Sequence, residues 1–210
     1  SKDEGMLEAF INDQDFHRAT AAKVYEVPFD EVTAEQRRNA KTVNFSITYG
    51  AGATNLSRQL GIKRTEASQL IEQYFKQFPG LKNYMKETVA SAREIGFVST
   101  LMGRKRKLRD INGKSSLARG NAERMAINTP IQGTAADMIK LAMISIHDAM
   151  KEKKYKSKMI MQVHDELVFD VYKPELDSVK ALVEDHMKNA LPDLTVPIKI
   201  GMDVGDNWLE

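Results

Sequence analysis

The 210-residue sequence contains no cysteine, and this absence excludes disulfide bonds, thiolate zinc sites and a cysteine nucleophile. No apolar run approaches the roughly 20 residues that a membrane helix needs, and we expect no signal peptide. The chain begins at Ser1 rather than at a methionine, so we expect it to be a piece of a longer protein.

Several catalytic signatures are absent as well. The sequence has no P-loop, GxGxxG or GxSxG pattern, which leaves kinase, dehydrogenase and hydrolase interpretations without support. None of the four histidines forms an HExxH pair. Since cysteine is missing too, we expect no zinc site.

Charge is distributed unevenly, although the formal net charge is only +2. Residues 1–36 carry three Lys and Arg against nine Asp and Glu, whereas residues 37–124 carry eighteen against six. Residues 125–210 are acidic again, with ten against fourteen. A basic middle between acidic flanks suits a polyanion such as nucleic acid, and a solvated lysine-rich surface explains it equally well.

The local patterns predict an α+β fold. We expect six helical segments, over 6–26, Ala34–Thr48, Thr65 to before Pro79, Leu81–Ile95, Ser116–Met150 and Pro174 to Ala190. The first should break at Asn12–Asp15, and the second should begin with a capping box at Thr33. The long fifth helix should bend at Pro130. We expect a hairpin over Phe97–Arg109 that turns at Met102-Gly103, and strands over Met159–Val163, Leu167–Val171 and Val196–Val204.

Four residues recur at every fourth position of one predicted helix: Arg37, Lys41, Phe45 and Tyr49. This spacing keeps them on one helix face, which presents two cations and then two aromatic rings. Cations suit the phosphates of a nucleoside triphosphate, and rings suit its sugar and base. The alternative is an amphipathic helix whose two aromatics pack in the core.

A second group, His164-Asp165-Glu166, separates two apolar strand-like runs. Tight hairpins usually contain Gly, Asn or Pro at the turn. A turn made of His, Asp and Glu instead favours a functional site. Carboxylates on a hairpin turn are good Mg²⁺ ligands, because hard cations prefer oxygen. An ordinary solvated acidic turn is the competing explanation.

Two further groups point to nucleic acid. Arg124, Asn128 and Gln132 form a polar stripe that could contact bases and sugars, or serve as a buried polar network or an exposed face. Arg104, Lys105 and Arg106 lie in a basic loop that could neutralise phosphates, or be merely solvated.

Several of these segments resemble family A DNA polymerases. The stretch Arg37–Gly50 is similar to their motif B, and Met161–Phe169 is similar to their motif C. Two other stretches, Asn128–Asp137 and Asp15–Ala21, also resemble the family, and the order along the chain is the same. The resemblance covers nearly the whole chain and implies mostly helical fingers over residues 1–115, followed by the C-terminal part of a palm with an antiparallel sheet over 116–210.

The resemblance implies a role for each matching residue. Nucleotide binding falls to His17, Arg37, Lys41, Phe45 and Tyr49, with Lys41 also counted as catalytic. Asp165 is implied as a Mg²⁺ ligand, with Glu166 close by as a second catalytic carboxylate. Contacts with primer and template fall to His164, Arg124, Asn128 and Gln132, joined by the basic loop.

The implied activity is template-directed DNA synthesis in replication and repair. A primer 3′-hydroxyl attacks the α-phosphorus of a dNTP, and two Mg²⁺ ions stabilise the attacking and leaving oxygens. The implied partners are primer–template DNA and dNTPs, with no membrane. We expect a monomeric parent enzyme in the bacterial cytoplasm, associated with the nucleoid.

The chain departs from the family pattern in three respects. No stretch of the form DYSQIELR occurs, so the second metal-binding aspartate is missing, and we expect the chain alone to be inactive. The thumb and any exonuclease domain are missing too. After Tyr49 and Gly50 come the small residues Ala51–Thr54, where relatives carry bulkier ones.

Two other functions remain open at this stage. A single-subunit RNA polymerase would share the basic helix, although Phe45 and the His-Asp-Glu triplet favour a DNA enzyme. A nucleic-acid-binding module without catalysis would bind DNA in a salt-dependent way and ignore nucleotide and Mg²⁺.

Overall fold

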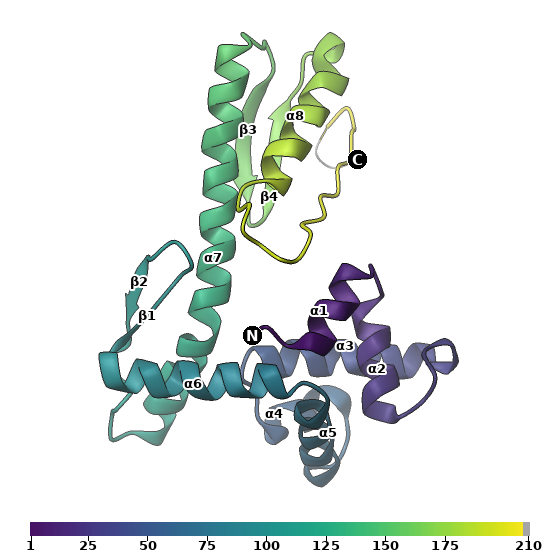
Figure 1. Ribbon diagram of the computed structural model, residues 1–210, viewed down its shortest axis with the longest axis vertical. Coiled ribbons are helices and arrows are strands. Elements are labelled where there is room, and N and C mark those ends of the chain that lie inside the picture. The colour runs from purple at the N-terminus through teal and green to yellow at the C-terminus, as the bar shows by residue number, and fades with distance from the viewer. Residues whose placement is uncertain (208–210) are drawn as a thin grey trace. The chain divides into compact units, whose positions relative to one another are not determined.

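The structure is a computed structural model, and it describes residues 1–207. Its elements follow in chain order (Figure 1) as α1 (Glu4–Ile11), α2 (Phe16–Tyr25), η1 (Phe29–Glu31), α3 (Ala34–Thr48), α4 (Ala53–Leu60), α5 (Arg64–Gln77), α6 (Pro79–Ile95), β1 (Phe97–Ser99), β2 (Lys105–Lys107), α7 (Ser116–Glu152), β3 (Lys158–Val163), β4 (Glu166–Asp170), η2 (Lys173–Glu175) and α8 (Leu176–Lys188). The predicted α+β fold class is confirmed.

The chain forms two compact units, Ser1–Ile131 and Gln132–Glu210, and helix α7 contributes residues to both. The proposed boundary between fingers and palm at residues 115 and 116 is a functional division, and it stays a prediction. The assigned helix runs through Pro130 without interruption, so the bend predicted there also stays a prediction.

Side-chain caps fix where the N-terminal helices begin. The buried Asp3 accepts a hydrogen bond from Met6 N at the start of α1 and another, at 2.8 Å, from Gly80 N in the first turn of α6. Two helix N-termini far apart in sequence therefore share one carboxylate, which satisfies backbone donors that would otherwise be orphaned.

Helix α3 spans the predicted residues and begins with the predicted capping box. Gln36 N donates to the Thr33 hydroxyl at 3.1 Å, and the Gln36 side chain accepts from Thr33 N at 2.9 Å. Helix α4 was not predicted. It has only eight residues, of which Leu56 alone is fully buried, so its sequence shows too short an apolar pattern to be recognised.

The core of the first unit lies under α3. Val43 and Ile47 on α3 pack with Leu56 from α4 and with Tyr74 and Phe78 around α5, all nearly inaccessible to solvent. This burial fixes which face of α3 points inward. The residues on its other face are consequently left at the surface.

A smaller cluster anchors the predicted hairpin. Strands β1 and β2 pair antiparallel, with Val98 opposite Arg106. Val98 and Leu108, the residue after β2, are buried against Ala122 and Ala126 of α7. Gly103 turns the hairpin with a φ of +80°, a conformation that favours glycine, which confirms the predicted turn.

The second unit packs β3, β4 and α8 with the C-terminal part of α7 (Figure 1). Strands β3 and β4 pair antiparallel, and Val163 faces Glu166 across the turn. The core is formed by apolar side chains of α7 and α8: Ala142, Ile146, Met150, Val179, Leu182 and Val183.

The prediction of a third strand over Val196–Val204 is wrong. Those residues are irregular, and within residues 1–207 β3 pairs only with β4. A strand needs a neighbour to exchange backbone hydrogen bonds, and an apolar sequence does not supply one. No helix in the described part of the chain is both long enough and apolar enough to cross a membrane.

Candidate nucleotide and DNA site

The predicted nucleotide-binding face of α3 is exposed. Phe45 is 48% and Tyr49, the residue that ends α3, is 46% exposed, whereas Val43 and Ile47 are 2% exposed. The alternative in which both aromatics pack in the core is therefore wrong. Arg37 and Lys41 are exposed as well, so all four side chains are accessible to a ligand.

Aromatic rings line this surface. The Phe45 and Tyr49 rings lie 6.5 Å apart and nearly parallel, at an interplanar angle of 8°. The His17 ring, contributed by α2, lies 5.8 Å from the Phe45 ring. Because α2 packs along α3, the three rings follow one another, and such a row can contact the flat and apolar parts of a nucleotide.

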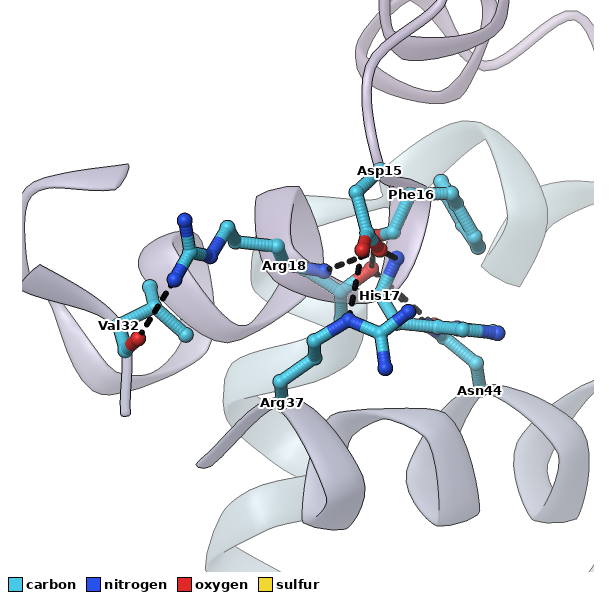
Figure 2. A network of polar contacts seen from close by, with 8 residues as sticks. Asp15, Phe16, His17, Arg18, Val32, Arg37 and Asn44 are labelled. Atoms are coloured by element: carbon cyan, nitrogen blue, oxygen red, sulfur yellow. Dashed lines mark hydrogen bonds and ion pairs between the residues drawn. The ribbon is translucent and has the colours of Figure 1, made fainter. Parts of the chain in front are cut away.

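Asp15 ties the beginning of α2 to the basic end of this surface. Its carboxylate caps α2 by accepting from His17 N and Arg18 N, and it also accepts from Arg37 Nε at 2.6 Å (Figure 2). Partial burial acts to raise the pKa of Asp15, but the hydrogen bonds from Arg37 and the α2 backbone outweigh it, and the pKa lies below its ordinary value.

His17 lies beside these charges on α2. Burial lowers its pKa, the Arg37 and Lys41 cations lower it further, and Asp15 opposes them. Because the ordinary pKa of histidine is about 6.5, this lowered pKa favours the neutral ring of His17 at pH 7. Its Nδ1 lies 3.1 Å from Nδ2 of the buried Asn44, on the inward side of α3 (Figure 2).

The polar stripe on α7 begins next to the end of α3. Asn128 Nδ2 lies 3.5 Å from the carbonyl oxygen of Tyr49. Gly50, with a φ of +74°, lies so close to Arg124 that a Cβ on it would be 3.0 Å from Arg124 Cγ. The structure thus brings Arg124 and Asn128 to Tyr49. Gln132, one turn later, is exposed and belongs to the second unit.

The basic hairpin presents Arg104, Lys105 and Arg106 on its exposed second strand and the turn before it. Lys105 Nζ lies 4.6 Å from the centroid of the Phe97 ring. The Arg106 guanidinium lies 3.3 Å from Thr129 Oγ1 and 3.1 Å from Met125 Sδ, both on α7. Arg106 therefore fastens the hairpin to the helix that carries Arg124 and Asn128.

The His164-Asp165-Glu166 group forms the turn between β3 and β4. Glu166 already belongs to β4, so the turn consists of His164 and Asp165. His164 has a φ of +54°, and its carbonyl accepts from Gln162 Nε2 at 2.9 Å. A positive φ at a residue other than glycine costs about 1–3 kcal/mol, and such strain clusters at functional sites.

Metal ligation at this turn can be tested against the donors present. Asp165 and Glu166 offer carboxylate oxygens, the chemistry that Mg²⁺ prefers. Within residues 1–207, however, no group of three or more His, Asp or Glu side chains converges on a point that could hold a metal ion. The turn fits the role of one contributor to a metal site, and the described residues do not complete that site.

The structure groups the predicted residues in two sets. His17, Arg37, Lys41, Phe45, Tyr49, Arg124 and Asn128 belong to the first unit, whereas Gln132, His164, Asp165 and Glu166 belong to the second. Two further residues of the first unit contact this set and had no predicted role: Asp15, which forms an ion pair with Arg37, and Asn44, which contacts His17. The signal for Asn44 was an amide on the apolar side of α3.

Comparison with known proteins decides the family. A sequence model described as DNA polymerase family A matches residues 1–210. The chain belongs to DNA polymerase family A. This match favours a DNA enzyme over the single-subunit RNA polymerase alternative.

Relatives in this family match the chain over its full length. DNA polymerase I of Lactococcus lactis subsp. cremoris is 46% identical over 211 residues, and that of Bacillus subtilis is 46% identical over 210 residues. Both alignments include 100% of the chain and 24% of the relative. The chain therefore spans about a quarter of the length of these relatives.

A solved structure is similar in fold as well. It is the POL domain of Pol1 from M. smegmatis in complex with DNA primer-template and dNTP. The TM-score is 0.89 at 42% sequence identity, and the alignment covers 94% of this chain and 35% of that one. An alignment over 94% of the chain includes residues of both compact units.

Proposed function

We propose that the chain forms the fingers and the C-terminal part of the palm of a template-directed DNA polymerase that acts in replication and repair. The observation that carries this proposal is the exposed face of α3, on which two cations precede two aromatic rings beside His17. The family match and the dNTP in the M. smegmatis complex support it.

We propose a task for each part of the α3 surface. Arg37 and Lys41 would hold the triphosphate of an incoming dNTP and offset the charge that develops on the departing phosphates. Phe45 would stack on the sugar and base, and Tyr49 would lie by the nascent base pair. This order along the helix matches the order of phosphate, sugar and base in a nucleotide.

The neighbouring elements would carry the DNA. Arg124 and Asn128 lie next to Tyr49, where the nascent base pair would be, and Gln132 and His164 would contact primer or template. Arg104 and Lys105 would contact phosphates of the duplex. Arg106 would contribute mainly by holding the hairpin on α7.

Asp165 would be a ligand for Mg²⁺, with Glu166 beside it as a second catalytic carboxylate. Two bound Mg²⁺ ions would supply stabilisation of the attacking and leaving oxygens during nucleotidyl transfer. A further carboxylate would have to complete the site. The residues of this chain bind and orient the nucleotide and the primer terminus.

We further infer a monomeric enzyme of the bacterial cytoplasm that associates with the nucleoid. The support is the shared family with bacterial DNA polymerase I. Primer–template DNA and dNTPs are the partners that the surface chemistry fits.

A hybrid enzyme tests the proposed function. The chain replaces the matching 210 residues of the B. subtilis DNA polymerase I, and primer extension is measured with dNTPs and Mg²⁺. We expect extension by the hybrid, its loss in Asp165→Ala, and a raised KM for dNTP in Lys41→Ala. Lys153→Ala, an exposed lysine outside the site, is the matched control.

Circular dichroism of the hybrid and its variants separates loss of function from loss of fold. Extension by a folded Asp165→Ala hybrid at the rate of the unmodified hybrid would contradict the catalytic role of the turn. Binding of primer–template without response to dNTP would instead identify a nucleic-acid-binding module.

A further inference from the structure

A chain of hydrogen bonds runs beneath His17 and ends at its ring. Asn44 Nδ2 lies 3.1 Å from His17 Nδ1 and 3.1 Å from Thr20 Oγ1. The Thr20 hydroxyl lies 2.8 Å from the carbonyl oxygen of Phe16. Thr20 and Asn44 are 0% and 4% exposed, so water does not compete for these contacts.

These hydrogen bonds determine which ring nitrogen of His17 carries the proton. A carbonyl only accepts, so the Phe16 carbonyl takes the single Thr20 hydroxyl proton, leaving Oγ1 as an acceptor. Asn44 must then turn its nitrogen towards Thr20, and its second amide hydrogen points at His17 Nδ1. Thr20 Oγ1 also lies 3.3 Å from Asn44 Oδ1, but the Phe16 carbonyl is nearer.

The opposite arrangement is costly. If the Asn44 amide were reversed, its oxygen would lie 3.1 Å from Thr20 Oγ1, and the buried Thr20 hydroxyl would have to give up the 2.8 Å hydrogen bond to the Phe16 carbonyl in order to donate to it. If His17 Nδ1 carried a proton, that proton would face the Asn44 amide hydrogen. The arrangement that satisfies every group leaves Nδ1 unprotonated and places the proton on Nε2.

The charged groups around His17 agree with a neutral ring. Arg37 and Lys41 from α3 disfavour an added proton, as does burial, whereas Asp15 at the start of α2 favours it. Asp15 is itself engaged with Arg37, which limits its effect on the ring. A third positive charge at this position is therefore unfavourable.

We propose that Asn44, held by Thr20, is a positioning residue that fixes His17 in the tautomer with its proton on Nε2, so that His17 acts as a neutral, directed hydrogen-bond donor to a nucleotide phosphate. The phosphate part rests on the proposed function. In this arrangement Arg37 and Lys41 supply charge, and His17 supplies a donor of fixed direction, because an amide hydrogen bond orients the ring.

The ¹⁵N NMR spectrum of the histidine side chains tests the tautomer directly. The 210-residue chain is labelled at its histidines, and the His17 signals are assigned from their loss in His17→Gln. At pH 7 we expect an unprotonated Nδ1 and a protonated Nε2. A protonated Nδ1, alone or together with Nε2, would overturn the proposal.

Two variants test the origin of the tautomer. Asn44→Leu has a similar shape and removes the donor, and Thr20→Val removes the acceptor that orients Asn44. Both should convert His17 to a mixture of tautomers, while the exposed His147 on α7 keeps its signals as an internal reference. An unchanged His17 tautomer in folded Asn44→Leu would overturn the positioning role.

Titration with dATP in Mg²⁺ buffer separates this proposal from the proposed function. We expect His17 Nε2–H to shift while Nδ1 stays unprotonated, and dATP affinity to fall about three- to tenfold in Asn44→Leu, the loss of one hydrogen bond. Protonation of Nδ1 on binding would overturn the neutral-donor role. If the chain binds no dATP, the proposed function fails, while the tautomer result decides the role of Asn44 independently.

Discussion

Arg37 shows, at the scale of a single residue, how the chain holds a cation in place without neutralising it fully. Its Nε contacts Asp15 at 2.6 Å, which leaves the two terminal guanidinium nitrogens for a phosphate. Asp15 is itself fixed by two backbone N–H groups of α2. The direction of Arg37 is thus set by the start of a neighbouring helix, which makes Asp15 part of the proposed nucleotide-binding surface.

Asp15→Asn separates the two tasks of this carboxylate. Asparagine caps a helix about as well as aspartate, so α2 keeps its cap and only the ion pair with Arg37 is lost. That pair is 45% and 36% exposed, so we expect a loss of about 0.2–1 kcal/mol in the free energy of unfolding at pH 7. Asp15→Ala should cost about 1 kcal/mol more, because it also removes the cap.

The difference in the free energy of unfolding between the wild type and Asp15→Asn should depend on pH, because the pKa of Asp15 is lowered in the folded state. A carboxyl whose pKa is lower in the folded state stabilises the fold above its unfolded pKa of about 3.9, and the stabilisation is lost as the pH falls through the folded pKa. Urea unfolding of the wild type and Asp15→Asn should therefore converge at acid pH. A difference that grows on acidification would contradict the assigned ion pair.

At the scale of elements, the junction between α3 and α4 joins the nucleotide surface to α7. Gly50 takes a φ of +74° and lies against the Arg124 side chain, so the end of α3 approaches α7 closely. Asn128 contacts the Tyr49 carbonyl one helical turn further along α7. A glycine at this position thus serves both the backbone turn and the close packing.

Gly50→Ala tests this junction, and Gly61→Ala is its matched control. Both glycines have a positive φ, +74° and +68°, but no atom lies within 4 Å of a Cβ built on Gly61. Gly61→Ala should cost about 1–2 kcal/mol for the left-handed backbone alone. Gly50→Ala should cost more, because it also displaces Arg124. If urea unfolding gives equal losses in the free energy of unfolding for the two variants, the contact with Arg124 does not contribute to stability.

The basic hairpin gives a second prediction at this scale. A lysine that neutralises one phosphate of duplex DNA contributes about 0.9 to the slope of log K against log salt concentration. Lys105→Gln should therefore weaken primer–template binding and reduce that slope by about this amount. Fluorescence anisotropy at several salt concentrations measures it, with Lys153→Gln as the control. A reduced affinity with an unchanged slope would exclude a phosphate contact at Lys105.

The elements that the sequence predicted well are those whose signals are local. The capping box at Thr33, the glycine at residue 103 and the break before Phe16 each act within a few residues, and the structure confirms them. Helix α4 was missed because its apolar pattern rests on a single buried leucine. The third strand was predicted wrongly because a strand depends on a neighbouring strand, which the sequence window does not show. Pairing is a long-range property that no short window contains.

The candidate site divides in the same way. Four-residue spacing was enough to place four residues on one face of α3, because helix geometry relates those residues directly. It did not decide whether that face is exposed, and the 48% and 46% exposure of Phe45 and Tyr49 does. The contacts of Asp15 with Arg37 and of Asn44 with His17 join different helices, at separations of 22 and 27 residues. Only the packing of α2 on α3 creates them, so spacing along one helix could not reveal them.

At the scale of the whole molecule, the proposed function divides one reaction between the two units. The first would bind the nucleotide through its cations and rings, and the second would contribute Asp165 and Glu166, on the turn between β3 and β4. Within residues 1–207, no cluster of carboxylates and histidines completes a metal site. Nucleotide binding and nucleotidyl transfer should therefore be separable in the 210-residue chain.

We expect the purified 210-residue chain to bind dATP and primer–template DNA but to extend no primer, because two-metal transfer needs carboxylates on both sides of the reacting phosphate. Binding is measured by calorimetry and anisotropy, and extension by incorporation of a labelled dNTP. The hybrid with B. subtilis DNA polymerase I is the positive control, since it supplies the rest of the polymerase. Incorporation by the chain alone that disappears in Asp165→Ala would show that its own residues suffice, and contamination is excluded because an unrelated polymerase would not respond to that substitution.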